Sequence, residues 1–300
     1  MDGVLVIDKP AGVGSTDVVR VLRRVARMRK VGHTGTLDPE ATGVLVVCLG
    51  RATRLVRFLQ EGRKVYRAEM VLGRTTTTQD AAGEVVEERS AAGVDEGRLC
   101  EVLGTFVGRI QQVPPMVSAV KVGGERLYEK ARRGETVERE PRDVEIHDLV
   151  LESFEPGELA RVRFDVTCSS GTYVRTLAHD IGERLGCGAS LSALRRLGNG
   201  GFTIDDAVTL EELEERGERN TLDEVVLSLR EAVADLPSVA VDADDAYAVA
   251  TGRPLPATGE EGPVAVVRAG DLLAIYADRD GAARPEAVFV QPSQLAGAGG

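Results

Sequence analysis

The residues with the clearest chemical potential lie in one glycine-rich segment, residues 32–43, with the sequence GHTGTLDPEATG. Within it, Asp38 precedes Pro39, and the proline favours an extended backbone at the aspartate. A single carboxylate on such a loop can act as a nucleophile, a general base or a stabiliser of positive charge. Asp-Pro pairs are also common in turns. These residues alone therefore leave a catalytic site and an ordinary turn both open.

The surroundings of this segment indicate a loop that is firmly positioned. Gly32, Gly35 and Gly43 permit positive φ angles and leave room for a ligand. The apolar run VLVVCLG, residues 44–50, follows directly and predicts a fully buried strand. Catalytic groups commonly lie on loops that such strands hold in place.

The remaining pattern predicts which elements surround the loop. Before it, residues 3–8 favour a strand, and a helix is expected from about 17 to 29, with Ser15 or Thr16 and Asp17 at its start. After it we expect helices at 52–61, near 95–105 and at 173–186, strands at 64–73, 143–154 and 159–169, and a short apolar and basic segment at 191–197. Strands and helices do not alternate regularly, so we predict an α+β domain on a mixed, mainly antiparallel sheet. From about residue 237 the chain favours a small β-barrel.

Composition limits the class of protein. The chain of 300 residues is 43% apolar and 28% charged, as in globular proteins. It has no apolar run near the ~18 residues of a membrane span. Its start has neither the basic region nor the long apolar region of a secretory signal, so a cytoplasmic protein is expected. The four cysteines and three histidines lack the spacing of a metal site, and we expect no metal.

Charge is distributed unevenly along the chain. Residues 1–67 hold 13 Lys and Arg against 6 Asp and Glu, whereas the rest of the chain holds 24 against 42. A local basic patch is sufficient to bind a phosphate backbone even when the net charge is −11. The run RVLRRVARMRK, residues 20–30, is a candidate for such a patch. It is equally typical of the solvated face of an amphipathic helix.

Five blocks, in order from about residue 3 to 204, resemble the bacterial tRNA pseudouridine-55 synthases, the TruB family. The blocks are GVLVIDKPAGVGS, GHTGTLDPEATGVL, KVYRAEMVLG with Thr78 to Gly83, PPMVSAVKVGGERLYEKARRG, and GTYVRTLAHDIG with LSALRRL. The resemblance implies a pseudouridine synthase fold over residues 1–236, with an RNA-gripping insertion at about 112–140. It also implies a PUA-like RNA-binding domain at 237–295 and a flexible tail at 296–300.

The resemblance implies three catalytic residues. Asp38 matches the essential aspartate of a reaction that breaks the glycosidic bond of a flipped-out uridine, turns the base and joins C5 to the ribose. Whether Asp38 acts as nucleophile or base stays open. Arg175 matches the arginine that pairs with this carboxylate, and we expect it to lower the pKa of Asp38. Tyr66 matches a tyrosine that lies against the base and could handle the C5 proton, unless it is simply a core residue.

The resemblance also implies residues that bind the substrate. His33 matches a residue that occupies the gap that the flipped nucleotide leaves in the T-loop. Tyr173 and Leu194 match positions that contact the flipped nucleotide, Tyr66 is expected at the base, and Lys9 is expected mainly to support the loop. Two departures stand out. Thr77 replaces an acid that the family often carries in its T-D-T-x-D block. The C-terminal region resembles a PUA domain only in its pattern of short apolar runs separated by glycines.

The expected partner is the T-arm stem-loop of tRNA. The isomerisation conserves every atom, so we expect no cofactor, and we expect a monomer that needs no guide RNA. Two alternatives remain: a non-catalytic RNA-binding or tRNA-folding protein, and a guide-RNA-dependent synthase of related fold. The insertion at 112–140 favours the enzyme that acts alone, and Asp38, Tyr66 and Arg175 argue against a loss of chemistry.

Overall fold

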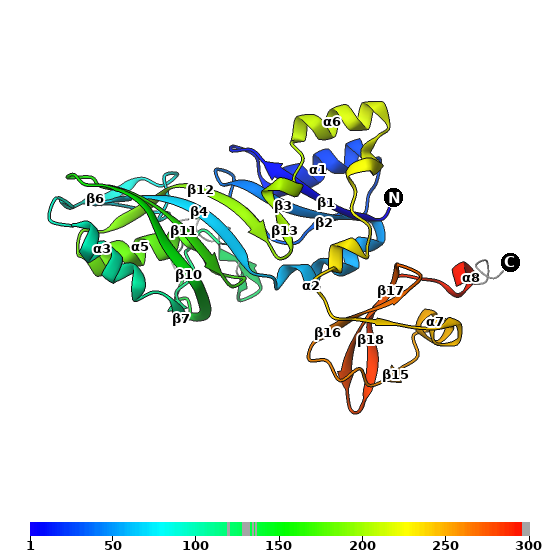
Figure 1. The fold of residues 1–300 in the computed structure, drawn as a ribbon. Coiled ribbons are helices and arrows are strands. Elements are labelled where there is room, and N and C mark those ends of the chain that lie inside the picture. Colours follow the sequence, from blue (N-terminus) through cyan, green and yellow to red (C-terminus); the bar gives the residue numbers. More distant parts are fainter. Residues whose placement is uncertain (119–120, 128–132, 134, 136, 296–300) are drawn as a thin grey trace.

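The computed structural model describes residues 1–118, 121–127, 133, 135 and 137–295 (Figure 1). The helices are α1 (Ser15–Val25), η1 (Gly50–Leu55), α2 (Val56–Gln60), α3 (Glu96–Gly104), α5 (Val174–Leu185), η2 (Ile204–Asp206), α6 (Leu210–Arg219), η3 (Leu222–Val225), η4 (Glu231–Val233), α7 (Ala243–Ala250) and α8 (Pro292–Leu295). The strands are β1 (Gly3–Lys9), β2 (Val31–His33), β3 (Thr42–Leu49), β4 (Lys64–Leu72), β5 (Arg74–Thr76), β6 (Val85–Glu88), β7 (Gly108–Gln112), β8 (Lys121–Val122), β9 (Glu125–Arg126), β10 (Arg142–Glu155), β11 (Arg161–Cys168), β12 (Ala189–Asn199), β13 (Phe202–Thr203), β14 (Ser238–Ala240), β15 (Leu255–Pro256), β16 (Pro263–Arg268), β17 (Asp271–Arg279) and β18 (Ala282–Val288).

A nine-stranded sheet forms the main body of the protein. Its strands run in the order β1-β3-β12-β4-β11-β10-β7, with β2 added beside β3 and β13 beside β12. The pair of β3 and β12 is parallel, and the other pairs of this sheet are antiparallel. The expectation of an α+β domain on a mixed, mainly antiparallel sheet is confirmed.

Strands β1 and β3 are buried on both faces, which explains their continuous apolar sequence. Leu5 and Leu45 pack on one face with residues of α1 and α6. Val4 and Val44 pack on the other face with residues of η1 and of the C-terminal sheet. A strand covered on both sides has no solvent-facing positions to fill with polar residues. The predicted buried strand at 44–50 is therefore confirmed.

Strand β12 is the main element that the sequence did not reveal. Residues 191–197, expected only as a short apolar and basic segment, form the middle of this strand, which joins β3 to β4. Its pairing with β4 shifts register between Leu191 and Ala193 and again between Arg196 and Gly198. These irregularities break the alternation of buried and exposed residues by which a strand is recognised.

Helix α1 differs from its prediction at both ends. Gly14 is the N-cap, and its N–H donates to the Asp17 carboxylate, because the Ser15 hydroxyl is used elsewhere. The helix ends at Val25 instead of about 29, since Arg27 takes a left-handed φ of 51°. The Met28 N–H then donates to the Arg23 carbonyl and closes the last turn.

A second, five-stranded sheet lies beside α2, in the order β14-β16-β17-β18-β15 (Figure 1). The apolar runs VAVVRAG and DLLAIYADRDG, which predict short strands, form β16 and β17, whereas AVFVQP only overlaps the end of β18. The sheet forms a PUA-like half-barrel. In the insertion, β8 and β9 form a small hairpin. The basic segment after it, ERLYEKARRGE, predicts a helix that lies outside the described residues. No helix in the described part of the chain is long and apolar enough to cross a membrane.

Candidate active site

The turn after β1 holds the loop that carries Asp38. The Ser15 hydroxyl donates to the Leu37 carbonyl at 2.9 Å and accepts from the Leu37 N–H at 2.8 Å. On the other side of Asp38, the Pro39 carbonyl accepts from the Lys9 ammonium at 2.9 Å and from the Gly12 N–H at 3.0 Å. Asp38 is thus fixed by anchors on both neighbours. Its own carbonyl accepts from the Ala41 N–H, so the segment is a turn as well.

Of the three glycines that permit positive φ, only Gly43 uses this freedom, with a φ of 97°. A side chain there would also meet the Arg196 carbonyl at 2.1 Å, so glycine is needed where β3 meets β12. The φ angles of Gly32 and Gly35 are not positive. Gly35 lies beside two buried cations, Lys64 and Arg196, which a Cβ at this position would contact.

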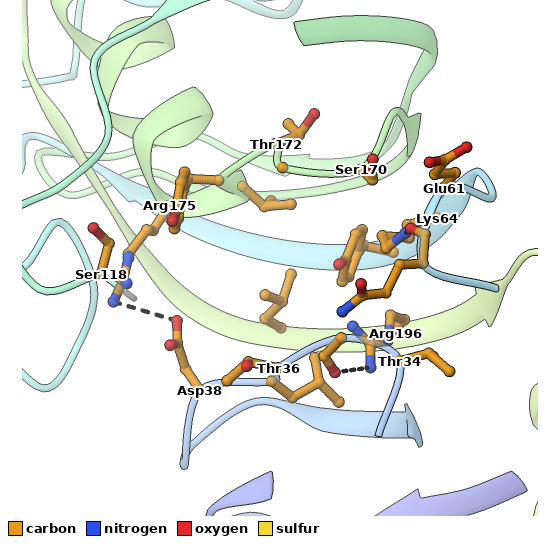
Figure 2. A pocket seen from close by; sticks show the side chains of 18 of the residues that line it. Thr34, Thr36, Asp38, Glu61, Lys64, Ser118, Ser170, Thr172, Arg175 and Arg196 are labelled. Carbon is orange, nitrogen blue, oxygen red and sulfur yellow. Dashed lines mark hydrogen bonds and ion pairs between the residues drawn. The ribbon is translucent and has the colours of Figure 1, made fainter. Parts of the chain in front are cut away.

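Asp38 and Arg175 meet at one end of a cavity of about 540 Å³ (Figure 2). The Arg175 Nη1 lies 3.3 Å from the Asp38 Oδ2, and 47% of the Asp38 side chain is exposed. The cavity volume is within the range of about 300–1,000 Å³ of small-ligand sites. A second cavity of about 350 Å³ also borders Asp38 and Arg175, below the loop that follows β5.

Arg175 is shared between two carboxylates, a feature that sequence reasoning missed. Its Nη1 lies closer to Asp80, at 2.8 Å, than to Asp38, and its Nη2 donates to the Val117 carbonyl at 2.5 Å. The Thr78 hydroxyl donates to Asp80 at 2.5 Å and orients it. Asp80 belongs to the Thr-x-Asp block, which was the available signal for its role. Thr77 stands in place of the acid that the family often carries. Its hydroxyl accepts a hydrogen bond from the Glu84 N–H at 3.1 Å.

Arg175 lowers the pKa of Asp38 as expected, but the net shift of this pKa is upward. Burial raises the pKa of Asp38, and the neighbouring Asp80 raises it further, while Arg175 acts in the opposite direction. The desolvation of the carboxylate outweighs the attraction of one guanidinium that a second carboxylate already engages. The site therefore holds a carboxylate that is more basic than an ordinary aspartate.

Tyr66 lines the same cavity from β4 and is almost fully buried. Burial raises the pKa of its phenol, and the nearby Arg196 guanidinium opposes this rise. The hydroxyl is therefore protonated at neutral pH. It can donate a proton or a hydrogen bond, and its ring offers a surface to a base.

The other predicted residues divide into two groups. Tyr173 and Leu194 line the cavity, and Gln112 holds the backbone of Tyr173 through two hydrogen bonds. Lys9 and His33 do not line it. Lys9 is completely buried under the loop. His33 is half-buried in β2, and its buried Nδ1 has no hydrogen-bond partner in the part of the chain that the structure describes.

Several further polar residues line the cavity that the sequence did not single out, among them Lys64, Ser118 and Arg196. These three are buried, and the Ser118 hydroxyl has no hydrogen-bond partner among the described residues. In the sequence, Lys64 and Arg196 look like ordinary basic residues of strands. Only the tertiary structure places them in the pocket.

Comparison with known families identifies the chain. The model of the TruB family pseudouridylate synthases, N-terminal domain, matches residues 23–174. The chain belongs to the TruB family. Two further models match the rest of the TruB chain: the tRNA pseudouridylate synthase B C-terminal domain at residues 175–234, and the tRNA pseudouridine synthase II C-terminal domain at 236–290.

Relatives and solved structures agree with this TruB assignment. The chain is 45% identical to tRNA pseudouridine synthase B of Thermobifida fusca, over 96% of this chain and 98% of the relative. It is 47% identical to that of Geobacter sulfurreducens, over 85% and 83%. A chain of a Cbf5-Nop10-Gar1 complex shares the fold with a TM-score of 0.77 and 29% identity, over 98% of this chain and 86% of that one. This TruB protein is accordingly a pseudouridine synthase with the pseudouridine synthase fold.

Proposed function

We propose that this synthase converts uridine 55 in the T-loop of tRNA to pseudouridine, with Asp38 as the essential carboxylate. Pseudouridine formation in tRNA is the activity named for the relatives that match nearly the whole chain. The single observation that carries the role of Asp38 is its ion pair with Arg175, at 3.3 Å, inside a cavity the size of a nucleotide.

The chemistry requires a carboxylate at this place. When the N1–C1′ bond of uridine breaks, positive charge develops on the sugar. An ionised Asp38 can stabilise this charge, attack C1′, or remove a proton from the sugar. The guanidinium of Arg175 keeps the carboxylate oriented, and the turn anchored by Ser15 and Lys9 keeps it in place.

The cavity accounts for recognition of a single unstacked base. Tyr66, Tyr173 and Leu194 supply ring and apolar surface for a pyrimidine. A uridine in a stacked loop cannot reach a carboxylate inside such a cavity, so the nucleotide must flip out. We assign His33 to the T-loop next to the flipped position, since it lies on the strand that leads into the loop of Asp38.

We further infer that the enzyme works as a cytoplasmic monomer, without a guide RNA and without a cofactor. The insertion at 112–140 and the domain at 237–295 offer additional surface for the tRNA. The catalytic domain at 1–236 contains the whole site. A guide-dependent synthase is the alternative suggested by the likeness to Cbf5.

Mapping on bare tRNA tests this proposal. The purified protein is incubated with a tRNA transcript, and pseudouridine is located by carbodiimide modification and primer extension. One stop at position 55, and turnover of a minimal T-arm stem-loop, are expected. A transcript with cytidine at position 55 is the matched control. Modification elsewhere, or a strict requirement for a guide RNA or a partner protein, would overturn the proposal.

A further inference from the structure

Two cations lie at the end of the active-site cavity that is opposite to Asp38. Lys64, at the start of β4, and Arg196, in β12, both line the cavity and lie apart from the Asp38–Arg175 pair (Figure 2). Lys64 is 6% exposed and Arg196 is 1% exposed. Arg196 in β12 is the register partner of Tyr66 in β4.

Neither cation is neutralised by a carboxylate. The Lys64 ammonium donates to the carbonyls of Gln60 and Gly62, each at 2.8 Å. Arg196 donates through Nε to the Val44 carbonyl at 2.6 Å and through Nη2 to the Gly35 carbonyl at 3.2 Å. Among the described residues, no ion pair involves either side chain. The adjacent Arg195, by contrast, pairs with Asp8 of β1 at 2.7 Å.

The two positive charges converge on Gly35. A methyl group at Gly35 would lie 3.8 Å from the Arg196 Nη1 and 4.0 Å from the Lys64 Cε. Burial and, to a smaller extent, the charge of Arg196 lower the pKa of Lys64 to about 8. Burying two like charges without a counter-ion is costly. An anion that forms beside them during the reaction would offset this cost.

The expected reaction supplies such an anion. When the N1–C1′ bond breaks, its electron pair remains with the uracil, and the resulting negative charge spreads over the ring nitrogens and the two oxygens. Attack of C5 on C1′ uses an electron pair of the ring and gives a neutral adduct that still carries the C5 hydrogen. The C5 proton is then lost to a base and N1 gains a proton, which gives pseudouridine. The sugar faces Asp38, so the base points toward the remaining lining of the cavity.

We propose that Lys64 and Arg196 are catalytic residues that stabilise the negative charge of the detached uracil. The proposal rests on the role of Asp38 given above. It assigns opposite tasks to the two ends of one cavity: a carboxylate faces the electron-poor sugar, and two cations face the electron-rich base. Preorganised charges of this kind act where charge develops and need no rearrangement.

The depth of the cations argues against a contact with the phosphate backbone. Phosphates of a bound stem-loop follow the solvent-exposed surface, whereas Lys64 and Arg196 have almost no exposed surface. A phosphate contact would mainly raise affinity, and it would contribute to the salt dependence of binding. The two roles therefore predict different experimental results.

Leaving-group dependence tests the proposal. Single-turnover rates are measured for T-arm stem-loops that carry uridine or 5-fluorouridine at the target. Because 5-fluorouridine has no C5 hydrogen to lose, the rate is followed for both substrates as disappearance of the parent nucleoside, by liquid chromatography and mass spectrometry of nuclease digests. The fluorine withdraws electrons and stabilises the uracil anion by itself. In Arg196→Gln and in Lys64→Gln, we expect the rate on uridine to fall about 100-fold. On 5-fluorouridine the fall in rate should be about tenfold smaller, because the fluorinated anion needs less stabilisation by the two cations.

Controls separate this role from a structural one. Arg195→Gln removes a charge from the same strand outside the cavity and should leave the ratio of the two rates unchanged. Arg196→Lys keeps the charge, so its ratio of the rate on uridine to the rate on 5-fluorouridine should lie between those of Arg196→Gln and the wild type. Equal losses on both substrates would overturn the proposal, as would weaker RNA binding with a flatter salt dependence. If wild-type protein forms no pseudouridine at all, the proposed function itself fails.

Discussion

Asp80 holds the guanidinium of Arg175 at 2.8 Å and so fixes the cation that faces Asp38 at 3.3 Å. The two carboxylates come from different loops, and both approach the same Nη1 atom. Arg175 is 6% exposed at its side chain, so its position is set by these partners and not by solvent. The carboxylate that we propose as catalytic therefore depends on Asp80, which does not line the main cavity.

Asp80→Asn tests this dependence. The amide keeps the size of the side chain but removes the charge that holds Arg175, so the arginine should shift toward Asp38 or lose its orientation. We expect kcat for pseudouridine formation to fall about tenfold, with little change in the Kd for tRNA. Tritium release from C5-labelled tRNA measures the rate. Asp165→Asn, on the exposed back of the sheet, is the matched control. A wild-type rate would show that Asp80 has no part in positioning.

Asp38→Asn should abolish the reaction. An amide cannot stabilise the positive sugar as a carboxylate does, nor act as nucleophile or base at neutral pH. Release of the C5 hydrogen should fall below about 0.1% of wild type, while the affinity for tRNA stays nearly intact. Filter binding on the same preparation measures the affinity. Turnover close to that of the wild-type enzyme would exclude the assigned role.

The acid limb of the pH profile should report Asp38. Burial raises the pKa of this carboxylate, with Asp80 raising it further and Arg175 lowering it. The active, ionised form is therefore lost as pH falls through a pKa above that of a free aspartate. In Arg175→Gln the lowering contribution disappears, so the acid limb of log(kcat/KM) should move to higher pH. A limb that stays in place would mean that another group controls the acid side.

Sequence reasoning identified the elements around the site better than the contacts within it. The strand after Asp38 was predictable, because burial on both faces leaves an unbroken apolar run such as Val44 to Leu49. Strand β12 was not, because its bulges break the alternation. The Asp80–Arg175 contact joins residues that are 95 positions apart, and no local pattern encodes it. Lys64 and Arg196 are residue types that usually lie on the surface, and only their burial in the structure distinguishes them from surface residues.

The basic end of α1 predicts a salt-dependent contact with tRNA. Arg23, Arg24 and Arg27 line one shallow depression at this end. Arg24 pairs with Glu214, and Arg23 donates to the Val31 carbonyl. Replacing all three by Ala should weaken tRNA binding and reduce the slope of log Kobs against log salt by about 2–3. Filter binding between low and moderate salt measures both quantities.

The matched control removes three arginines from the opposite side of the main sheet. Arg67, Arg161 and Arg163 lie on exposed positions of β4 and β11, away from the face that packs against α5. Their replacement by Ala changes the net charge equally and should leave the salt slope unchanged. If both triple variants behave alike, the arginines of α1 form only a solvated helix face.

Lys9→Met should destabilise the protein without weakening its hold on RNA. Lys9 is 0% exposed, and its ammonium donates to the carbonyls of Pro10, Val13 and Pro39 at 2.8, 2.7 and 2.9 Å. Methionine fills the space but removes three hydrogen bonds, and of the three acceptors the Pro39 carbonyl keeps a donor in the Gly12 N–H. We expect a cost of about 3 kcal/mol in the free energy of unfolding. Urea unfolding measures this loss.

Lys30→Met, the same change at an exposed lysine, should leave the free energy of unfolding unchanged. The rate of pseudouridine formation should fall in Lys9→Met, because the Pro39 carbonyl is an anchor directly after Asp38. The Kd for tRNA should stay constant, since Lys9 does not line the cavity. A phosphate contact predicts the reverse: weaker binding with a flatter salt dependence, and a protein of normal stability. Because the two outcomes differ in sign for stability and for affinity, one variant decides whether Lys9 supports the loop or binds the substrate.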